Sequence, residues 1–190
     1  MIGELQMQNT PLTSPRLILR LCTLQDLPFI HLLHSLPETD EFNTQGIPTN
    51  PEETQSIVEQ WIREHEKNPI MKYSFSIVLK QSNELIGLVS LRLGPAKYKN
   101  GEVSYKIHPN HWKKGYATEA LNSVIDFAFH TLKLHRIEAG CAIDNIASIK
   151  VLEKVGMQRD GRMRQLLPLK NGWSDNYEYS LLDTDVRTAT

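Results

Sequence analysis

The chain has 190 residues, which suits one domain and is short for two, so we expect a single domain over 1–190. Its 21 basic and 22 acidic residues leave a net charge of −1, which excludes a global field that would attract nucleic acid. No apolar run approaches the ~20 residues of a membrane-spanning helix, and the first residues do not resemble a signal peptide. We therefore expect a cytoplasmic protein with no membrane or nucleic-acid partner.

The elements predicted first along the chain are one strand and two helices. A strand over 16–23 is followed by a helix over 24–36, with Thr23 as its N-cap. A loop rich in proline, glycine and acidic residues follows at 37–51, and helical spacing returns over 52–66. This part therefore predicts the order strand, helix, helix.

The apolar period then changes to two, and the second half alternates strands with helices. Strands are predicted at 72–80, 84–93, 101–108 and 135–143, helices at about 115–132 and at 144–156, and a final hairpin from 157–167 and 172–182. Gly156 provides the C-terminal stop of the second of these helices. The whole order predicts a mixed α+β fold, with one central sheet of about seven strands flanked by about four helices.

The cysteines and histidines do not suggest a disulfide or a metal site. Cys22 and Cys141 each lie in a strand-like run, which fits buried thiols in a reducing compartment. His108 and His111 are not spaced as metal ligands. We expect no metal cofactor.

The stretch HPNHWKKGYATEA, residues 108–120, gathers two lysines and a glycine between a predicted strand and a predicted helix. A helix N-terminus exposes N–H groups and the positive end of the helix dipole, and glycine lets a ligand approach the backbone closely. The stretch is therefore suited to an anion such as a diphosphate. The alternative is a helix start with two solvated lysines, and the motif alone leaves both open.

A wider pattern surrounds this loop. It is Tyr105-x-Ile107-x-Pro109-x-x-Trp112-x-x-Gly115-x-Ala117-x-Glu119-Ala120. This pattern resembles the acetyl-CoA signature of the GNAT N-acetyltransferase superfamily, and in particular the subgroup that includes the Rim-type ribosomal-protein N-terminal acetyltransferases. Segments 14–20, 144–157 and 171–182 resemble other motifs of that subgroup in the same order. The departures are Lys113 and Ser104, where glycine is usual, and Met157, where Phe is usual.

The resemblance implies a fold and a co-substrate. The sheet is expected to be mostly antiparallel and to splay between its fourth and fifth strands, so that the backbone of 103–107 holds the pantetheine arm of acetyl-CoA. The residues expected to bind acetyl-CoA are Tyr105, Ile107, Lys113, Lys114, Gly115, Tyr116, Ala117, Thr118, Asn145 and Ser148. Asn145 has an alternative role as a helix N-cap, and the two roles are compatible.

Acetyl transfer to an amine needs a base for the amine and a proton donor for the leaving thiolate. By resemblance Glu102 is the candidate base, and the alternative is a solvated charge on a strand. Ser148 is the candidate hydrogen-bond donor to the coenzyme sulfur, and the alternative is a structural serine in the first helical turn. An acyl-enzyme on Cys141 lacks a neighbouring base in the pattern, so we expect packing there.

The expected function is acetyl transfer from acetyl-CoA to a primary amine, with a protein or peptide N-terminus favoured by the resemblance. The alternatives are a small-molecule amine (a polyamine, amino acid or antibiotic) and a non-catalytic acyl-CoA-binding module. Loops 37–51 and 168–173 are expected to wall the acceptor site. An acidic mouth that attracts an ammonium group would come from Glu38, Asp40, Glu41, Glu52 and Glu53, and solvated loop acids are the alternative. The sequence leaves monomer and homodimer open.

Overall fold

A computed structural model describes residues 10–187. In chain order the elements are β1 (Leu12–Thr13), β2 (Leu17–Leu21), η1 (Leu24–Asp26), α2 (Leu27–Ser35), α3 (Pro37–Asp40), α4 (Pro51–His65), β3 (Lys72–Leu79), β4 (Leu85–Leu93), η2 (Ala96–Tyr98), β5 (Asn100–Ile107), η3 (Pro109–His111), α5 (Tyr116–Asp126), η4 (Phe127–Thr131), β6 (Arg136–Ala142), α6 (Ile146–Lys154), β7 (Gln158–Leu169) and β8 (Gly172–Leu182). The expected absence of a signal peptide concerns the first residues, which lie outside the described range. The single domain over 1–190 stays a prediction.

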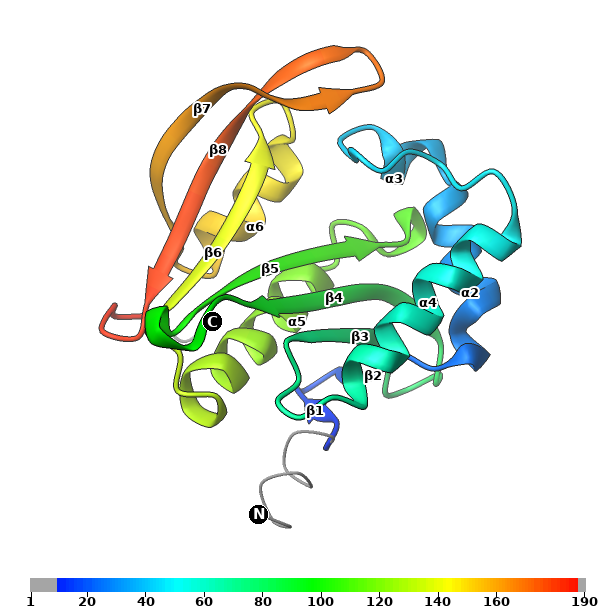
Figure 1. Cartoon of the computed structure of the whole chain (residues 1–190), viewed down its shortest axis with the longest axis horizontal. Helices are drawn as coiled ribbons and strands as arrows, with labels where there is room; N and C mark the ends of the chain where they lie inside the picture. Colours follow the sequence, from blue (N-terminus) through cyan, green and yellow to red (C-terminus); the bar gives the residue numbers. More distant parts are fainter. Residues whose placement is uncertain (1–9, 188–190) are drawn as a thin grey trace.

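The strands of the described range form one sheet in the order β1-β2-β3-β4-β5-β6-β8-β7, which has eight strands (Figure 1). Every neighbouring pair is antiparallel except β5 and β6, which are parallel. β3 is buried along both faces, whereas β7 at the edge of the sheet is mostly exposed. The predicted mixed, mostly antiparallel sheet is confirmed.

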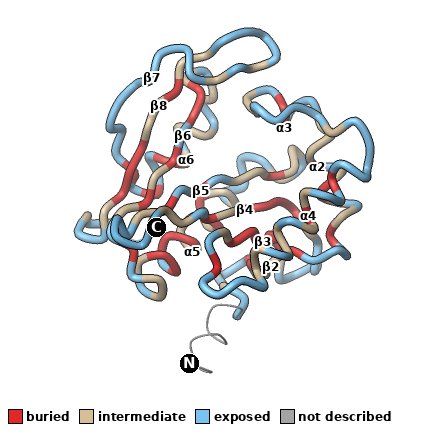
Figure 2. Tube along the Cα trace, in the orientation of Figure 1, coloured by how far each residue is buried: buried red, intermediate tan, exposed pale blue. Residues whose placement is uncertain are grey.

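Helices cover the two faces of the sheet and bury two apolar clusters (Figure 2). The larger cluster joins α5, through residues such as Leu121 and Ile125, to Phe75, Val89 and Val103 on the strands. The smaller one joins α2 and α4 to Leu88, whose side chain points to the opposite face from that of Val89. The sheet therefore lies between α5 on one face and the pair α2 and α4 on the other.

β5 and β6 stay together for only three register pairs, Asn100–Arg136 through Glu102–Glu138. β5 continues to pair with β4 along its length, from Gly101 to Ile107. Beyond Glu102 the two parallel strands diverge, and Figure 1 shows β6, β8 and β7 turning away from β5. The predicted splay is confirmed, and it leaves one side of residues 103–107 without a neighbouring strand.

The structure differs from the sequence prediction in four local elements. The short strand β1 pairs with β2 ahead of the predicted first strand, and the first helix begins with the turn η1 before α2 starts at Leu27. The predicted loop 37–51 opens with the four-residue helix α3. The helix predicted to run to about residue 132 is α-helical only to Asp126 and continues as the π-helical turn η4. Each element is short, so its apolar pattern is too brief to specify it.

Candidate functional site

The loop between β5 and α5 turns sharply at two residues with positive φ. Lys113 has φ 60° and Gly115 has φ 79°, both in the left-handed region that glycine favours. The Trp112 indole fixes the entry to this turn, because its Nε1–H donates to the Ile107 carbonyl at 2.7 Å. Lys113 thus adopts the backbone conformation of the glycine that it replaces, and its exposed side chain remains at the turn.

The first turn of α5 follows this loop directly. The N–H groups of Tyr116, Ala117 and Thr118 have no preceding helical carbonyl to bond, since the first α-helical bond of this helix runs from Glu119 to Gly115. Lys114 donates its Nζ to the Asn110 carbonyl at 2.9 Å, inside the loop. Exposed lysines, a left-handed glycine and a helix start therefore occur at one place, which fits a diphosphate.

The space between the diverging strands holds a polar cluster. Tyr105 Oη lies 2.7 Å from Ser148 Oγ and 3.2 Å from the Ser148 carbonyl oxygen. Asn145 Oδ1 accepts the Ser148 N–H at 3.0 Å, which confirms the predicted N-cap of α6. Cys141 is buried nearby, and burial raises the pKa of its thiol while a hydrogen bond with Ser148 opposes the rise. Three of the predicted site residues, Tyr105, Asn145 and Ser148, are thereby brought together.

Glu102 lies apart from that cluster, at the last paired position of β5 and β6. Along a strand it is three residues, or roughly 10 Å, from Tyr105, and it points to the opposite face. Its carboxylate forms an ion pair with Arg92 of β4 and is exposed. Strand alternation places Glu102, Ser104 and Lys106 on one face of β5, opposite Arg92, Ser90 and Leu88 of β4. Glu102 as the base stays a prediction.

A cavity of about 470 Å³ lies where the loop after α3 approaches the tip of the β7–β8 hairpin (Figure 1). Its lining residues are Glu41, Phe42, Ile143, Asp144, Arg162, Leu169, Asn171, Gly172, Trp173, Ser174 and Asp175. Ile143 and Asp144 follow the end of β6, so the cavity lies at the open end of the splay. Both loops that the sequence analysis expected to wall the acceptor site contribute to it.

Only one of the five acids expected at an acidic mouth, Glu41, lines the cavity. Asp40 is 7% exposed, and the Glu53 carboxylate accepts hydrogen bonds from the backbone and hydroxyl of Thr49 at 2.8 and 2.9 Å. Burial removes Asp40 from an acidic mouth, whereas Glu53 is exposed, and for the other acids the expectation stays a prediction. Asp144, which follows β6, is a lining acid that the loop composition did not indicate.

Comparisons with known proteins agree with this geometry. The family model described as "Acetyltransferase (GNAT) domain" matches residues 16–158. The chain belongs to this GNAT acetyltransferase family. The predicted family, and with it acetyl-CoA as the family's co-substrate, is confirmed.

Two uncharacterized N-acetyltransferases of Bacillus subtilis are similar to this chain. The chain is 34% identical to the uncharacterized N-acetyltransferase YnaD of Bacillus subtilis over 113 residues, which are 58% of the chain and 65% of YnaD, less than two thirds of that relative. It is 29% identical to YoaA of the same species over 171 residues, or 90% of the chain and 96% of YoaA.

Two solved GNAT structures share the fold at 23% identity. The spermidine N-acetyltransferase of Vibrio cholerae, in complex with CoA and spermine, has a TM-score of 0.80 over 90% of this chain and 98% of that one. The ribosomal-protein-S5-alanine acetyltransferase of Vibrio fischeri has a TM-score of 0.80 over 94% of this chain and 100% of that one. At this identity the likeness concerns the fold alone.

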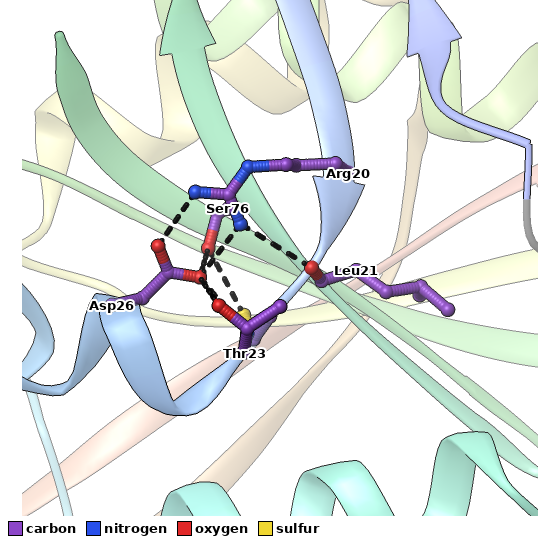
Figure 3. A network of polar contacts seen from close by, with 6 residues as sticks. Arg20, Leu21, Thr23, Asp26 and Ser76 are labelled. Atoms are coloured by element: carbon purple, nitrogen blue, oxygen red, sulfur yellow. Dashed lines mark hydrogen bonds and ion pairs between the residues drawn. The ribbon is translucent and has the colours of Figure 1, made fainter.

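In this GNAT domain Arg20, from the motif segment 14–20, has a structural role together with Asp26 (Figure 3). Asp26 accepts two hydrogen bonds from the Arg20 guanidinium, at 2.8 and 2.6 Å, and others from the Thr23 N–H and the Ser76 hydroxyl, each at 2.9 Å. Burial alone would raise the pKa of Asp26, but these donors together lower it. The network ties the start of the first helix to β2 and β3.

Lys106 is a charged residue of β5 that the sequence pattern did not indicate as a site residue. It is half-buried on the face of β5 that carries Glu102. Burial lowers the pKa of Lys106, and the carboxylate of Asp40 opposes that effect. His34 is affected by the same environment: burial, together with Lys106 and His31, lowers its pKa to about 4. Only strand alternation could have indicated this position.

Two general expectations concern absences. Within residues 10–187 no group of three or more His, Cys, Asp or Glu side chains is placed to hold a metal ion. Over the same range, no helix has the length and apolar character that crossing a membrane requires.

Proposed function

We propose that this chain transfers the acetyl group of acetyl-CoA to a primary amine, and that the amine is the N-terminus of a peptide or protein. The observation that carries the proposal is the cavity at the open end of the β5–β6 splay, lined by both candidate acceptor loops. An acceptor in this cavity and a thioester between the diverging strands would meet inside the sheet layer. The splay would thus bring the acceptor amine and the thioester together.

The residues of the β5–α5 loop fit the coenzyme. The first-turn N–H groups of α5, with the exposed side chains of Lys113 and Lys114, would hold its diphosphate. The backbone of 103–107, which lacks a strand neighbour on one side, would hold the pantetheine arm and polarise the acyl carbonyl. Asn145 can add its amide N–H groups, because its Oδ1 serves the N-cap.

Bound acetyl-CoA supplies an acyl thioester. The amine nitrogen forms a bond to the acyl carbon, the carbon–sulfur bond breaks, and the sulfur leaves as a thiolate. Glu102 would take the proton that the attacking amine loses, directly or through water. Ser148 would donate a hydrogen bond to the leaving sulfur from the other side of the splay.

The chemistry of the amine favours an N-terminus over a lysine side chain. An α-amino group with a pKa of about 7.7–8.0 is roughly one-quarter neutral near pH 7.4, whereas a lysine at about 10.4 is neutral in only about one molecule in a thousand. The cavity also offers Phe42, Leu169 and Trp173 beside its acids, which suits a peptide with side chains. An exposed indole can contact an ammonium group through its face.

A polyamine is the second candidate acceptor. The cavity lining holds three carboxylates, Glu41, Asp144 and Asp175, against the guanidinium of Arg162, so the formal excess is two negative charges. Arg162 is ion-paired with Asp175, which leaves Glu41 and Asp144 as the further acids. A short polycation would complement that excess, and one solved relative is a spermidine acetyltransferase.

The experiment is a competition assay that measures released CoA with a thiol reagent and locates the acetyl group by mass spectrometry. The acceptors are a peptide with a free N-terminus and an internal lysine, the same peptide with a blocked N-terminus, and spermidine. We expect the free N-terminus to be acetylated and the blocked peptide to be inert.

The other outcomes assign the alternatives. Equal acetylation of both peptides would contradict the N-terminal assignment and indicate side-chain amines. Preference for spermidine would make the second candidate the function. Acetyl-CoA binding without CoA release for any amine would indicate a non-catalytic acyl-CoA-binding module. The variant Trp173→Ala should raise the KM for the peptide and leave the affinity for CoA unchanged, because Trp173 lies in the hairpin and not in the β5–α5 loop.

A further inference from the structure

The hydroxyl of Tyr105 reaches across the splay from β5 to the first turn of α6. Its Oη lies 2.7 Å from Ser148 Oγ, within the usual range for O–H···O hydrogen bonds, and 3.2 Å from the Ser148 carbonyl. Both residues are half-buried. This contact links the side chains of β5 and α6 in the region where β5 no longer pairs with β6.

Either hydroxyl can donate in the 2.7 Å contact, and their relative acidity favours the phenol as donor. The Ser148 carbonyl can only accept, so the phenol hydrogen points toward Ser148 in either contact. The shorter contact is to Ser148 Oγ, and a phenol is a stronger acid than an alcohol, so it is the better donor. Burial raises the pKa of Tyr105, although the bond with Ser148 opposes this, so the phenol keeps its proton at neutral pH. With the phenol as donor in the 2.7 Å contact, Ser148 Oγ accepts and the serine hydrogen points elsewhere.

The backbone of Ser148 is fixed as well. Its N–H donates to Asn145 Oδ1 at 3.0 Å in the N-cap of α6. The nearby Cys141 Sγ–H is directed at backbone carbonyls, that of Ala142 at 3.4 Å and that of Asn145 at 3.7 Å. Ser148 is therefore held through its backbone by the N-cap and through its hydroxyl by Tyr105.

We propose that Tyr105 is a positioning residue for the acetyl transfer: by donating to Ser148 Oγ, its hydroxyl turns the Ser148 O–H toward the sulfur that leaves the thioester. This inference rests on the proposed function. Donation by the phenol also polarises the serine hydroxyl, since linked hydrogen bonds strengthen one another. Tyr105 acts through Ser148 and has no bond of its own to the sulfur.

The test measures the acidity of the CoA thiol bound to the full chain, by ultraviolet difference titration of the thiolate against pH. Wild type, Tyr105→Phe, Ser148→Ala and the double variant are compared, and Tyr98→Phe, which removes the hydroxyl of an exposed tyrosine, is the matched control. We expect the acid dissociation constant of the bound thiol to fall by about tenfold in each single variant, the scale of a hydrogen bond to a charged acceptor. The double variant should be no worse than Ser148→Ala, because the two residues act as one unit.

The positioning role would be overturned if Tyr105→Phe left the acid dissociation constant of the bound thiol unchanged while Ser148→Ala lowered it. It would also be overturned if both variants left that constant unchanged. Failure of folded wild type to bind CoA would overturn it together with the proposed function. The positioning role and the proposed function can also fail separately. If the bound thiol is more acidic in wild type than in Tyr105→Phe but no amine is acetylated, the acetyl transfer is contradicted and the contact is supported. Phe keeps the ring of Tyr105, so packing is preserved, and thermal unfolding of each variant checks this.

Discussion

The carboxylate of Glu119 binds Arg16 twice, through the Arg16 backbone N–H at 2.8 Å and through its Nε at 2.6 Å. Ser14 Oγ donates to the same carboxylate at 2.7 Å, and Arg16 Nη1 donates to the Lys114 carbonyl at 3.0 Å. The guanidinium also lies 4.5 Å from the centre of the Tyr116 ring. Two motifs that lie about a hundred residues apart in the sequence therefore hold the start of α5 in place together.

Glu119→Gln should destabilise the protein, because an amide cannot accept from all three donors and leaves a partly buried one unpaired. We expect the free energy of unfolding to fall by ~1–3 kcal/mol in a denaturant titration, and the affinity for CoA to fall as the Lys114 turn loosens. Glu66→Gln, on the exposed end of α4, is the control and should stay within about 0.5 kcal/mol of wild type. Equal stability of the two variants would contradict a role for this contact.

Asp26→Asn should reveal a pH-dependent part of the stability. The folded state lowers the pKa of Asp26, so its contribution is present above the unfolded value of about 3.9 and is lost as the pH falls through the folded pKa. We expect a loss on the order of 2 kcal/mol at pH 7, less than for a fully buried pair because the Arg20 side chain is 37% exposed. The difference between wild type and Asp26→Asn should shrink as denaturant titrations move from pH 7 toward pH 3. A constant difference would contradict the linkage.

Much of the fold follows from local pattern. Alternation along β5 puts Val103 and Ile107 on one face of the strand, and the structure buries both. Cap residues predicted the start of α6 at Asn145 and its end near Gly156, which has φ 94°. These predictions succeed because the physical cause lies within a few residues of the effect.

The site was less predictable, because its contacts join distant segments. The sequence indicated Tyr105 and Ser148 separately, yet their 2.7 Å contact depends on how α6 packs against the diverging strand. The burial of Asp40 likewise depends on the position of α3 over the sheet, which the acidic composition of the loop does not encode. Composition therefore overstated the acidic mouth, and no local pattern indicated Asp144 as a lining residue.

Gly115→Val should weaken CoA binding. Gly115 has φ 79°, where a β-branched residue is strained, and an added Cβ would lie 3.4 Å from Arg16 Nη2, in the turn that we propose for the diphosphate. We expect the affinity for CoA to fall at least about tenfold by calorimetry, or ~1.4 kcal/mol. Gly46→Val is the matched control, since Gly46 also has a positive φ, 75°, and open space around it but lies in the loop 37–51. An unchanged affinity in folded Gly115→Val would remove the loop from the coenzyme site.

Glu102→Gln separates the base from a solvated strand charge. If Glu102 removes the amine proton, turnover at neutral pH should fall by ~10²-fold while CoA binding is kept, and the loss should narrow at high pH, where more of the amine is already neutral. The ion pair with Arg92 supplies the control, because Arg92→Gln breaks the same pair and keeps the carboxylate. A base freed from its partner still accepts a proton, so Arg92→Gln should retain turnover. An equal loss in both variants would show that the ion pair is what matters, and unchanged turnover in Glu102→Gln would leave Glu102 as a strand charge.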